Sequence, residues 1–495
     1  MATGCLFLDL PRELRDIIYE YYVSDGGYIF DFETGRLRTT EGYPINLALT
    51  FTCRQVASEM NGIALRNNTI FFHAIRLEEK RKWPHSYPEL LRISYALKRI
   101  MFRCARSCFT ADLKSRVAQV YPDFMPAFDL TDVEHQWDAG GAGFAPSVIH
   151  SATDYALDLA SSHPSFPSAM SEFRQDPSMD WEGIEPDHEA LNSLRYQPWS
   201  IPTEALTRRV AIACGYRQLR TGRRPNGLDS IRKHNFSAAA ACIQFLESIP
   251  IRIRSEIRSI ILDEDLPGIA RQADHARGLI PFCQENPSLR VKRHANLWRN
   301  VFLYGLIDDS HPLSRSNSNF QSNIMVEQLS TRMTEAVSLW TVETLALISA
   351  GMPPDSFCLI LDGNPVPVRS SEIFQQIVKR HASWQAVMEE CIKRGFINRF
   401  NLLQNEEFRY DCYFYKQFPE AFDNIVNKRT SIVRCNFDMG TYSLSDLEHQ
   451  VEERRGWTLR QWRNDWYSLV SFIDLFPSIR DFTDILDELR RWTPT

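Results

Sequence analysis

The sequence lacks any long uninterrupted apolar run. No uncharged apolar stretch approaches the roughly 20 residues that a membrane-spanning helix needs. The start, Met1 to Arg15, lacks a basic segment followed by an apolar one, so we expect no secretory signal. The 11 cysteines show no regular spacing, which is typical of proteins from reducing compartments. We therefore expect an intracellular protein, cytoplasmic or nuclear, without a membrane as a partner.

The common catalytic and cofactor motifs are also missing. The chain has no His-Glu-x-x-His, no Gly-x-Ser-x-Gly, no Walker loop, no Gly-x-Gly-x-x-Gly and no Cys-x-x-Cys. Cys104 and Cys108 are one helical turn apart, but no second pair of ligands follows closely enough to complete a structural zinc site. We therefore expect a protein that is not an enzyme and that has no cofactor and no metal.

One acidic cluster supports an alternative hypothesis. Asp263, Glu264 and Asp265 follow a predicted apolar strand, and Asp274 and His275 come about ten residues later. Carboxylates at a strand end beside an imidazole can hold a divalent cation or position a general base. The alternative is therefore a metal-dependent or acid–base enzyme, although solvated loops at strand ends often carry acidic residues without any catalytic role.

Charge is strongly segregated, although the net charge is only −6. Residues 123–191 hold 14 Asp and Glu against one basic residue, Arg174, together with six prolines from Pro126 to Pro186. Such a composition favours loop or disorder, because too little apolar area can be buried to offset the entropy of ordering. We interpret residues 123–191 as an acidic insertion or linker rich in Pro, Gly and Ser.

The residues that follow have the opposite charge. Residues 208–233 contain eight Arg and Lys against Asp229 alone. Clustered cations can bind the phosphates of nucleic acid, which is a further hypothesis. The segment has no Gly-rich phosphate loop and a single aromatic residue, Tyr216. We interpret it as a solvated surface and do not expect nucleic acid as a partner. A shorter basic run, residues 290–294, could face an anion.

Apolar spacing predicts mainly helices with a few strands. Pro11 suits a first helical position, and apolar side chains recur at helical spacing after it, at Leu14, Ile17, Ile18 and Tyr21. Further helices are expected at 49–63, 90–97, 238–246 with Ser237 as N-cap, 324–350, 371–394 and 459–473. Strands are expected at 28–32, 36–38, 69–72, 99–102, 257–262 and 357–361. No fixed repeat period is visible, although helix-then-strand units could be degenerate repeats.

Two short motifs lie within residues 10–59. The first is Leu-Pro-Arg-Glu-Leu-Arg at 10–15, followed by Ile18, Tyr19 and two tyrosines at 21–22. The second is Leu-Ala-Leu-Thr at 47–50, followed by Thr-Cys-Arg-Gln-Val at 52–56 and Glu59. Together they resemble the two halves of an F-box, and most of all the F-box-like N-termini of large, mostly uncharacterised fungal protein groups. The resemblance covers about 70 of the 495 residues.

The resemblance implies a partner. In F-box proteins this helical module docks on the Skp-type adaptor of a cullin–RING ubiquitin ligase, and the rest of the chain recruits a protein substrate, whose identity is unknown here. Helix-in-groove binding of this kind depends on a few aliphatic anchors. Carried over to this sequence, the adaptor-binding residues are Leu10, Pro11, Leu14, Ile18, Leu49, Cys53 and Val56.

The sequence departs from the F-box pattern between the two motifs. A compact F-box joins these helices by a short turn, whereas here residues 23–46 intervene and contain a predicted hairpin. Whether this insertion covers Leu14 and Ile18 decides whether the resemblance extends to adaptor binding.

These patterns predict a helix-dominated α+β fold. A small F-box-like helical module with an inserted hairpin is followed by a mixed helical body with a few strands. The expected divisions are an F-box-like module at 1–72, a helix and strand connection at 73–122, the acidic insertion or linker at 123–191, and a helix-rich α+β body at 192–495.

Overall fold

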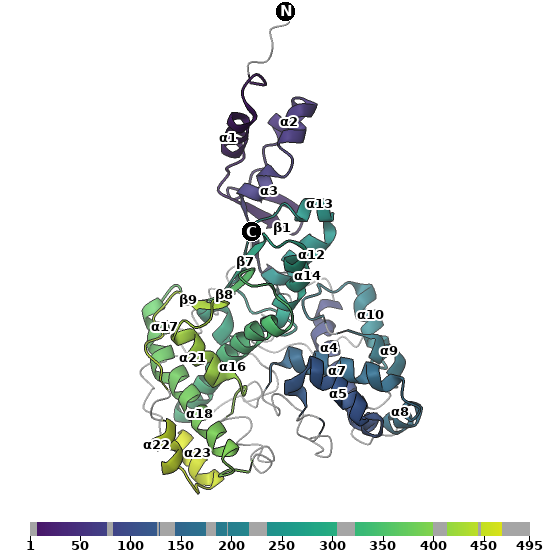
Figure 1. Ribbon diagram of the computed structural model, residues 1–495, viewed down its shortest axis with the longest axis vertical. Coiled ribbons are helices and arrows are strands. Elements are labelled where there is room, and N and C mark those ends of the chain that lie inside the picture. Colours follow the sequence, from purple (N-terminus) through teal and green to yellow (C-terminus); the bar gives the residue numbers. More distant parts are fainter. Residues whose placement is uncertain are drawn as a thin grey trace, which may run out of the picture.

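The computed structural model describes residues 7–76, 83–125, 128, 144–174, 185–195, 197–216, 235–303, 322–398, 413–443 and 447–467. The fold is helix-dominated α+β, as predicted, and is built around a seven-stranded sheet. Figure 1 shows the N-terminal helices projecting above the sheet, with a helical lobe on one side below it and the C-terminal helices on the other. Among the described residues, no helix is both long enough and apolar enough to cross a membrane.

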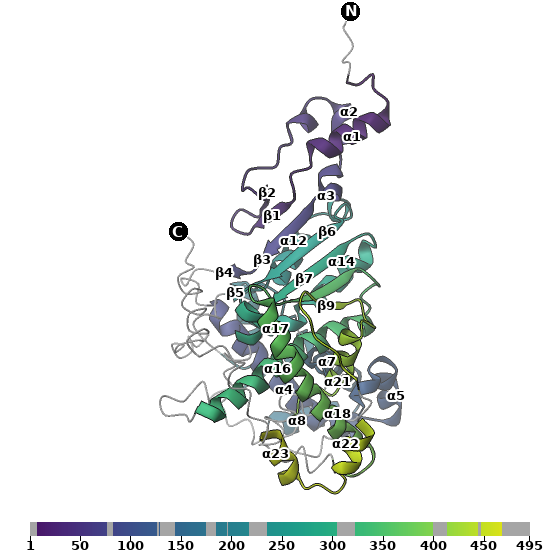
Figure 2. The same ribbon diagram turned by 90° about the vertical axis from the view of Figure 1, so that its left-hand side faces the viewer.

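The strands of the sheet lie side by side almost in chain order. The order is β2-β1-β3-β6-β7-β8-β9, and every pair is parallel except β1 with β2. Figure 2 shows the strands next to one another. Their bounds are β1 Tyr28–Asp31, β2 Arg36–Thr39, β3 Thr69–His73, β6 Ser259–Glu264, β7 Arg290–Asn296, β8 Phe357–Asp362 and β9 Val433–Cys435. A separate antiparallel pair joins β4 (Ile75–Arg76) to β5 (Asn235–Phe236).

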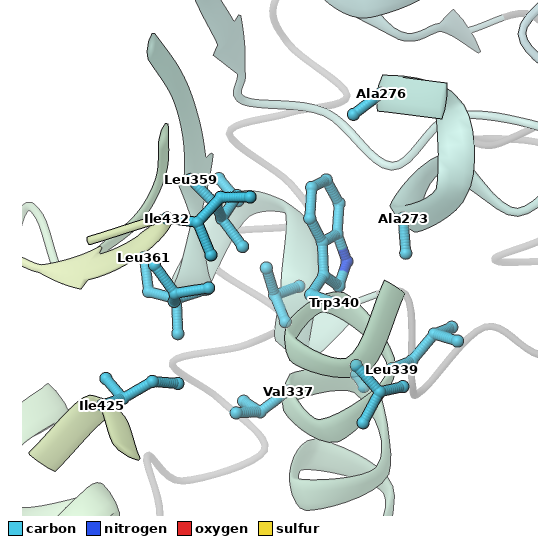
Figure 3. Packing of buried hydrophobic residues seen from close by; sticks show 14 of the residues in the cluster. Ala273, Ala276, Val337, Leu339, Trp340, Leu359, Leu361, Ile425 and Ile432 are labelled. Carbon is cyan, nitrogen blue, oxygen red and sulfur yellow. The ribbon is translucent and has the colours of Figure 1, made fainter. Parts of the chain in front are cut away.

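The main core lies between one face of the sheet and the helices packed on it. These are α12 (Ala238–Ser248), the 3-10 segment η6 (Gln272–Leu279), α14 (Ile280–Glu285) and α16 (Ser322–Ser349). Figure 3 shows Trp340 of α16 between Ala273 and Ala276 of η6 and Leu359 and Leu361 of β8. The short α13 (Ile251–Arg254) and the π segment η7 (Leu297–Val301) complete this region.

Burial alternates along the strands, so the two faces of the sheet differ. On β6, Ile260, Leu262 and Glu264 are buried, whereas the residues between them are only partly buried. The same alternation holds on β7 and β8. We call the buried side the inner face and the opposite side the outer face.

The C-terminal helices extend the core through a cluster of tryptophans. α17 (Pro367–Ile373), the π segment η9 (Phe374–Val378) and α18 (Lys379–Lys393) follow one another directly, which confirms the helix predicted at 371–394. Trp384 of α18 contacts Trp462 and Trp466 of α23 (Leu459–Tyr467). The remaining helices here are α21 (Phe418–Val426) and α22 (Leu447–Glu453).

The helical lobe has a hydrophobic core of its own, formed by residues between Tyr87 and Cys214. Its elements are α4 Trp83–Cys104, η2 Ala105–Cys108, α5 Ala111–Val120, η3 Pro122–Phe124, α7 Pro146–Ser161, α8 Phe166–Arg174, α9 His188–Ser193 and α10 Glu204–Ala213. The strand predicted at 99–102 is wrong, because these residues continue α4, and Met101 and Phe102 are buried in the lobe.

The acidic segment is also more ordered than its composition predicts. Residues 146–161 and 166–174 form α7 and α8, which bury apolar side chains such as Leu157 and Phe173 in the lobe core. The expectation of loop or disorder is therefore wrong for these residues. Only Asp154, Asp158 and Glu172 of the 14 acidic residues lie in these two helices, so the average over 123–191 hid two helices with few charged residues. The stretches 129–143 and 175–184 lie outside the described residues.

The first predicted unit has the expected hairpin but a different second helix. β1 and β2 confirm the hairpin inserted after α1 (Arg12–Tyr22). The helix predicted at 49–63 is instead three short pieces: η1 Ala48–Phe51, α2 Arg54–Glu59 and α3 Ile63–Asn67. Cys53 is extended between the first two, and Gly62 adopts a left-handed conformation, with φ of 77°, before the third. These two residues interrupt the helical hydrogen bonds.

The predicted boundary at residue 72 falls within a strand. β3 ends at His73 and pairs along its whole length with β6, which belongs to the predicted body. β1 pairs with β3 in turn. The strands of residues 28–73 are therefore part of the body sheet, and only α1 to α3 form a separate N-terminal unit, with a small core around Tyr19 and Val56.

Trp340→Ala should destabilise the protein by about 3–5 kcal/mol, because it removes a large, fully buried side chain and leaves a cavity between α16 and the sheet. Ile348→Ala on the same helix is the matched control. Ile348 is 57% exposed, and we expect a change within about 0.5 kcal/mol. Denaturant unfolding of both variants measures the difference, and equal losses would contradict the packing described here.

Candidate functional site

The first helix presents its apolar side chains to solvent. The exposed fractions are 48% for Leu14, 62% for Ile17, 39% for Ile18 and 86% for Tyr21. These positions are spaced i, i+3, i+4 and i+7, so they lie on one side of α1. We call these four residues the α1 ridge. A surface helix usually turns its apolar side inward, and α1 does the reverse.

The inner side of α1 packs through a buried polar cluster beside the small apolar core around Tyr19 and Val56. The Glu59 carboxylate of α2 accepts two hydrogen bonds from Arg15, at 2.9 Å from Nε and 2.6 Å from Nη2. It also accepts one from the Tyr19 hydroxyl at 2.7 Å and one from Gln55 at 3.0 Å. Arg15 also donates to the carbonyls of Leu8 and Leu10. This cluster fixes α1 against α2 and thereby fixes the direction of the ridge.

The charges in this cluster shift the pKa of its acidic groups. The Arg15 hydrogen bonds, together with those of Tyr19 and Gln55, lower the pKa of Glu59 to about 2. Burial, and then the hydrogen bond to Glu59, raises the pKa of Tyr19 to about 12. At neutral pH the cluster therefore contains a carboxylate, a guanidinium and a neutral phenol, which satisfy one another.

The predicted adaptor-binding residues divide into two groups. Leu14 and Ile18 are exposed on the ridge, and Pro11 and Cys53 are exposed beside α1 and α2. Val56 is only 2% exposed and Leu49 packs against the apolar cluster that contains Val56, so these two residues support the unit from inside; Leu10 is half-buried. Ile17, Tyr21 and Phe51, which is 82% exposed, add apolar surface that the resemblance did not assign.

The inserted residues 23–46 leave the ridge exposed. β1 and β2 pair with each other, and β1 joins β3 in the body sheet. Figure 2 shows this hairpin at the base of the N-terminal unit, below α1 and α2. The insertion therefore connects the unit to the sheet and does not cover Leu14 or Ile18.

The acidic cluster of the enzyme hypothesis serves the fold. Glu264 is buried, and its two oxygens accept hydrogen bonds from Arg293, Gln272 and the first two amides of α12. The Arg293–Glu264 ion pair is 2.8 Å long. Asp263 points to the outer face, where it lies 3.4 Å from His73. Neighbouring carboxylates of one strand therefore face opposite ways, and Asp265 is partly exposed.

His275 is equally committed to the fold. Its Nδ1 lies 2.6 Å from the Ser237 hydroxyl, and its Nε2 lies 2.9 Å from the Ala270 carbonyl oxygen. Burial, with the nearby charge of Arg293, lowers the pKa of His275 to about 3, so the ring is neutral. Asp274 is buried in η6. Across the described ranges, no group of three or more His, Cys, Asp or Glu could hold a metal ion.

The structure describes all of the basic run 290–294 but only the first part of the basic segment 208–233. In 290–294, Arg293 is buried against Glu264, whereas Arg290, Lys292 and His294 lie on the outer face. In 208–233, Arg208 pairs with Glu204 within α10, and residues 217–234 lie outside the described residues. A cavity in the helical lobe, beside the buried Lys98–Asp154 pair, has about 40 Å³, room for a few water molecules only.

Glu264→Gln should cost about 3–5 kcal/mol of stability, because it leaves the buried Arg293 without its counter-ion. The matched control is Asp263→Asn, which alters a partly exposed pair and should cost less than about 1 kcal/mol. Chemical denaturation compares the two. A Glu264 variant as stable as the unmodified chain would show that this carboxylate has no structural role.

Glu59 should make the N-terminal unit sensitive to acid. Its pKa is about 2 in the fold against an ordinary 4.5, so its stabilisation is complete above pH 4.5 and is lost as the pH falls towards 2. Hydrogen exchange of the α1 amides, corrected for intrinsic rates, measures this loss. Glu59→Gln should abolish the pH dependence, whereas Glu13→Gln, an exposed change on α1, should preserve it. Constant protection of α1 over this range would contradict the role given to Glu59.

Comparisons with known proteins found no match to this chain, whether among family models, curated proteins or solved structures. The functional interpretation therefore depends on the geometry of the chain's own residues, above all on the exposed α1 ridge and the cluster that holds it.

Proposed function

We propose that the N-terminal unit docks on a Skp-type adaptor protein through the α1 ridge. The observation that carries this proposal is the exposure of Leu14, Ile17, Ile18 and Tyr21 on one side of a helix whose other side is held by a buried ion pair. Apolar side chains gathered on one exposed helix face mark an interaction site. Their spacing suits a helix that binds in an apolar groove.

The ridge is ordered before binding. Arg15, Tyr19 and Glu59 connect α1 to α2 by hydrogen bonds between side chains, and Val56 packs beneath them. A partner would therefore meet anchors whose backbone is already fixed, which lowers the entropy lost on binding. This supports docking of the folded unit rather than folding on contact.

The position of the unit also supports recruitment of a second protein. Figure 1 shows α1 and α2 at one end of the molecule, away from the helical lobe and the C-terminal helices. An adaptor on the ridge would leave those surfaces accessible. We infer that the chain is a substrate-recruiting subunit of a cullin–RING ubiquitin ligase, active in the cytoplasm or nucleus, without chemistry of its own.

Changing Leu14 and Ile18 together to aspartate should weaken binding of a purified Skp-type adaptor about a hundredfold or more, because two apolar anchors become charged. Isothermal titration calorimetry measures the affinity. Both side chains are exposed, so the fold and the melting temperature should change little.

The control changes exposed apolar residues elsewhere. Ile251→Asp on α13 and Val368→Asp on α17, at 60% and 73% exposed, should leave adaptor binding unchanged. The proposal fails if the unmodified chain does not bind the adaptor, or if the Leu14 and Ile18 variant binds as tightly as the unmodified chain.

A further inference from the structure

The outer face of the sheet carries partly exposed side chains across neighbouring strands. Parallel sheets in proteins are usually buried on both faces. Here the inner face is buried, whereas Ile29 on β1, Phe71 on β3 and Ile261 on β6 are only partly buried on the outer face. Such a face presents apolar surface that the described residues do not fully cover.

These three residues belong to one straight row across five strands. The strand registers place Arg38 opposite Ile29, Ile29 opposite Phe71, Phe71 opposite Ile261, and Ile261 opposite Lys292. We call these five residues the outer row. Three apolar side chains are thus flanked by a cation at each end. With strands about 4.8 Å apart, the row is about 19 Å long, the length of about six extended residues.

Among the described strand residues, the outer face carries five Arg and Lys against three aspartates, Asp31, Asp263 and Asp362, although the whole chain has a net charge of −6. Two of its aspartates are already engaged: Asp31 with Arg38 at 2.8 Å and Asp263 with His73 at 3.4 Å. Four exposed cations on this face have no carboxylate partner among the described residues: Arg36, Arg290, Lys292 and Arg434. An acidic ligand would supply the missing charge.

We propose that the outer row binds an extended segment of a partner protein in which apolar side chains are flanked by aspartate or glutamate. The apolar side chains would cover Ile29, Phe71 and Ile261, and a carboxylate would pair with Lys292 at one end. Given the function proposed above, on which this identification of the partner rests, the segment belongs to the protein that is recruited.

The distribution of charge favours a peptide over a nucleic acid. A phosphate backbone carries a negative charge at every nucleotide and would lie close to Asp31 and Asp263, which are on the outer face two residues along their strands from Ile29 and Ile261. The row itself contains no carboxylate. A peptide with charges at its ends only can follow the row without this repulsion.

Selection of random displayed peptides on the full chain tests the proposal. We expect enriched sequences that combine apolar residues with flanking Asp or Glu and that bind more weakly as salt rises. Lys292→Glu should weaken the enriched peptides about tenfold, because a cation becomes a like charge, and Lys292→Ala should weaken them less. Circular dichroism and melting establish that these exposed variants fold.

Arg252→Glu, an exposed cation on α13, is the matched control and should not change peptide affinity. The ridge variant with Leu14 and Ile18 changed to aspartate should also bind the peptides normally, while Lys292→Glu should bind the Skp-type adaptor normally. Enriched peptides without acidic residues, or with equal affinity for Lys292→Glu, would overturn the outer-row proposal. If the unmodified chain binds the peptides but not the Skp-type adaptor, the function proposed above fails and the outer-row proposal stands.

Discussion

A buried ion pair between Glu264 and Arg293 holds the centre of the protein together. Glu264 lies on β6 and Arg293 on β7. The Glu264 carboxylate also accepts hydrogen bonds from the first two backbone amides of α12 and from the Gln272 side chain. Arg293 in turn donates to the carbonyls of Gln272 and Ala273 and lies 4.5 Å from the ring centre of Trp340. Removing two charges from water is unfavourable unless their hydrogen bonds are satisfied, and here they are. The pair therefore sets the position of α12, η6 and α16 on the sheet.

Glutamates whose hydrogen bonds are satisfied inside the protein also join elements at two other places. Glu343 of α16 is buried and accepts hydrogen bonds from the Ser147 amide and hydroxyl at the start of α7, which attaches the helical lobe to the body. Glu59 attaches α1 to α2 through Arg15. In each case a buried glutamate joins two parts of the fold by hydrogen bonds, whereas other parts are joined mainly by apolar packing. At α1 the ion pair and the small apolar core together hold the inner side, while Leu14, Ile17, Ile18 and Tyr21 stay exposed on the outer side.

Local sequence patterns predicted much of the fold. The Ser237 N-cap, the hairpin at β1 and β2 and the long helices at 322–349 and 367–393 all follow from short-range signals. Pairing of β3 with β6 could not be predicted in this way, because 185 residues lie between His73 and Ser259 along the chain. The apolar stripe of α1 was visible in the sequence, but periodicity shows which residues share a side, not which side faces inward. Arg15 and Glu59 were the missed signal: two charged residues that become partners only once α1 lies against α2.

The path of the chain around the helical lobe has a consequence for how this protein can change. The chain leaves the sheet after β3 and returns before β6, and these two strands are direct neighbours. Ile75 pairs with Phe236 and Arg76 with Asn235. The segment that enters the lobe and the segment that leaves it therefore form a short antiparallel pair of strands. The lobe is thus an insertion between adjacent strands. Its length and surface can be remodelled, by evolution or by a protein engineer, without any strand exchanging its neighbours.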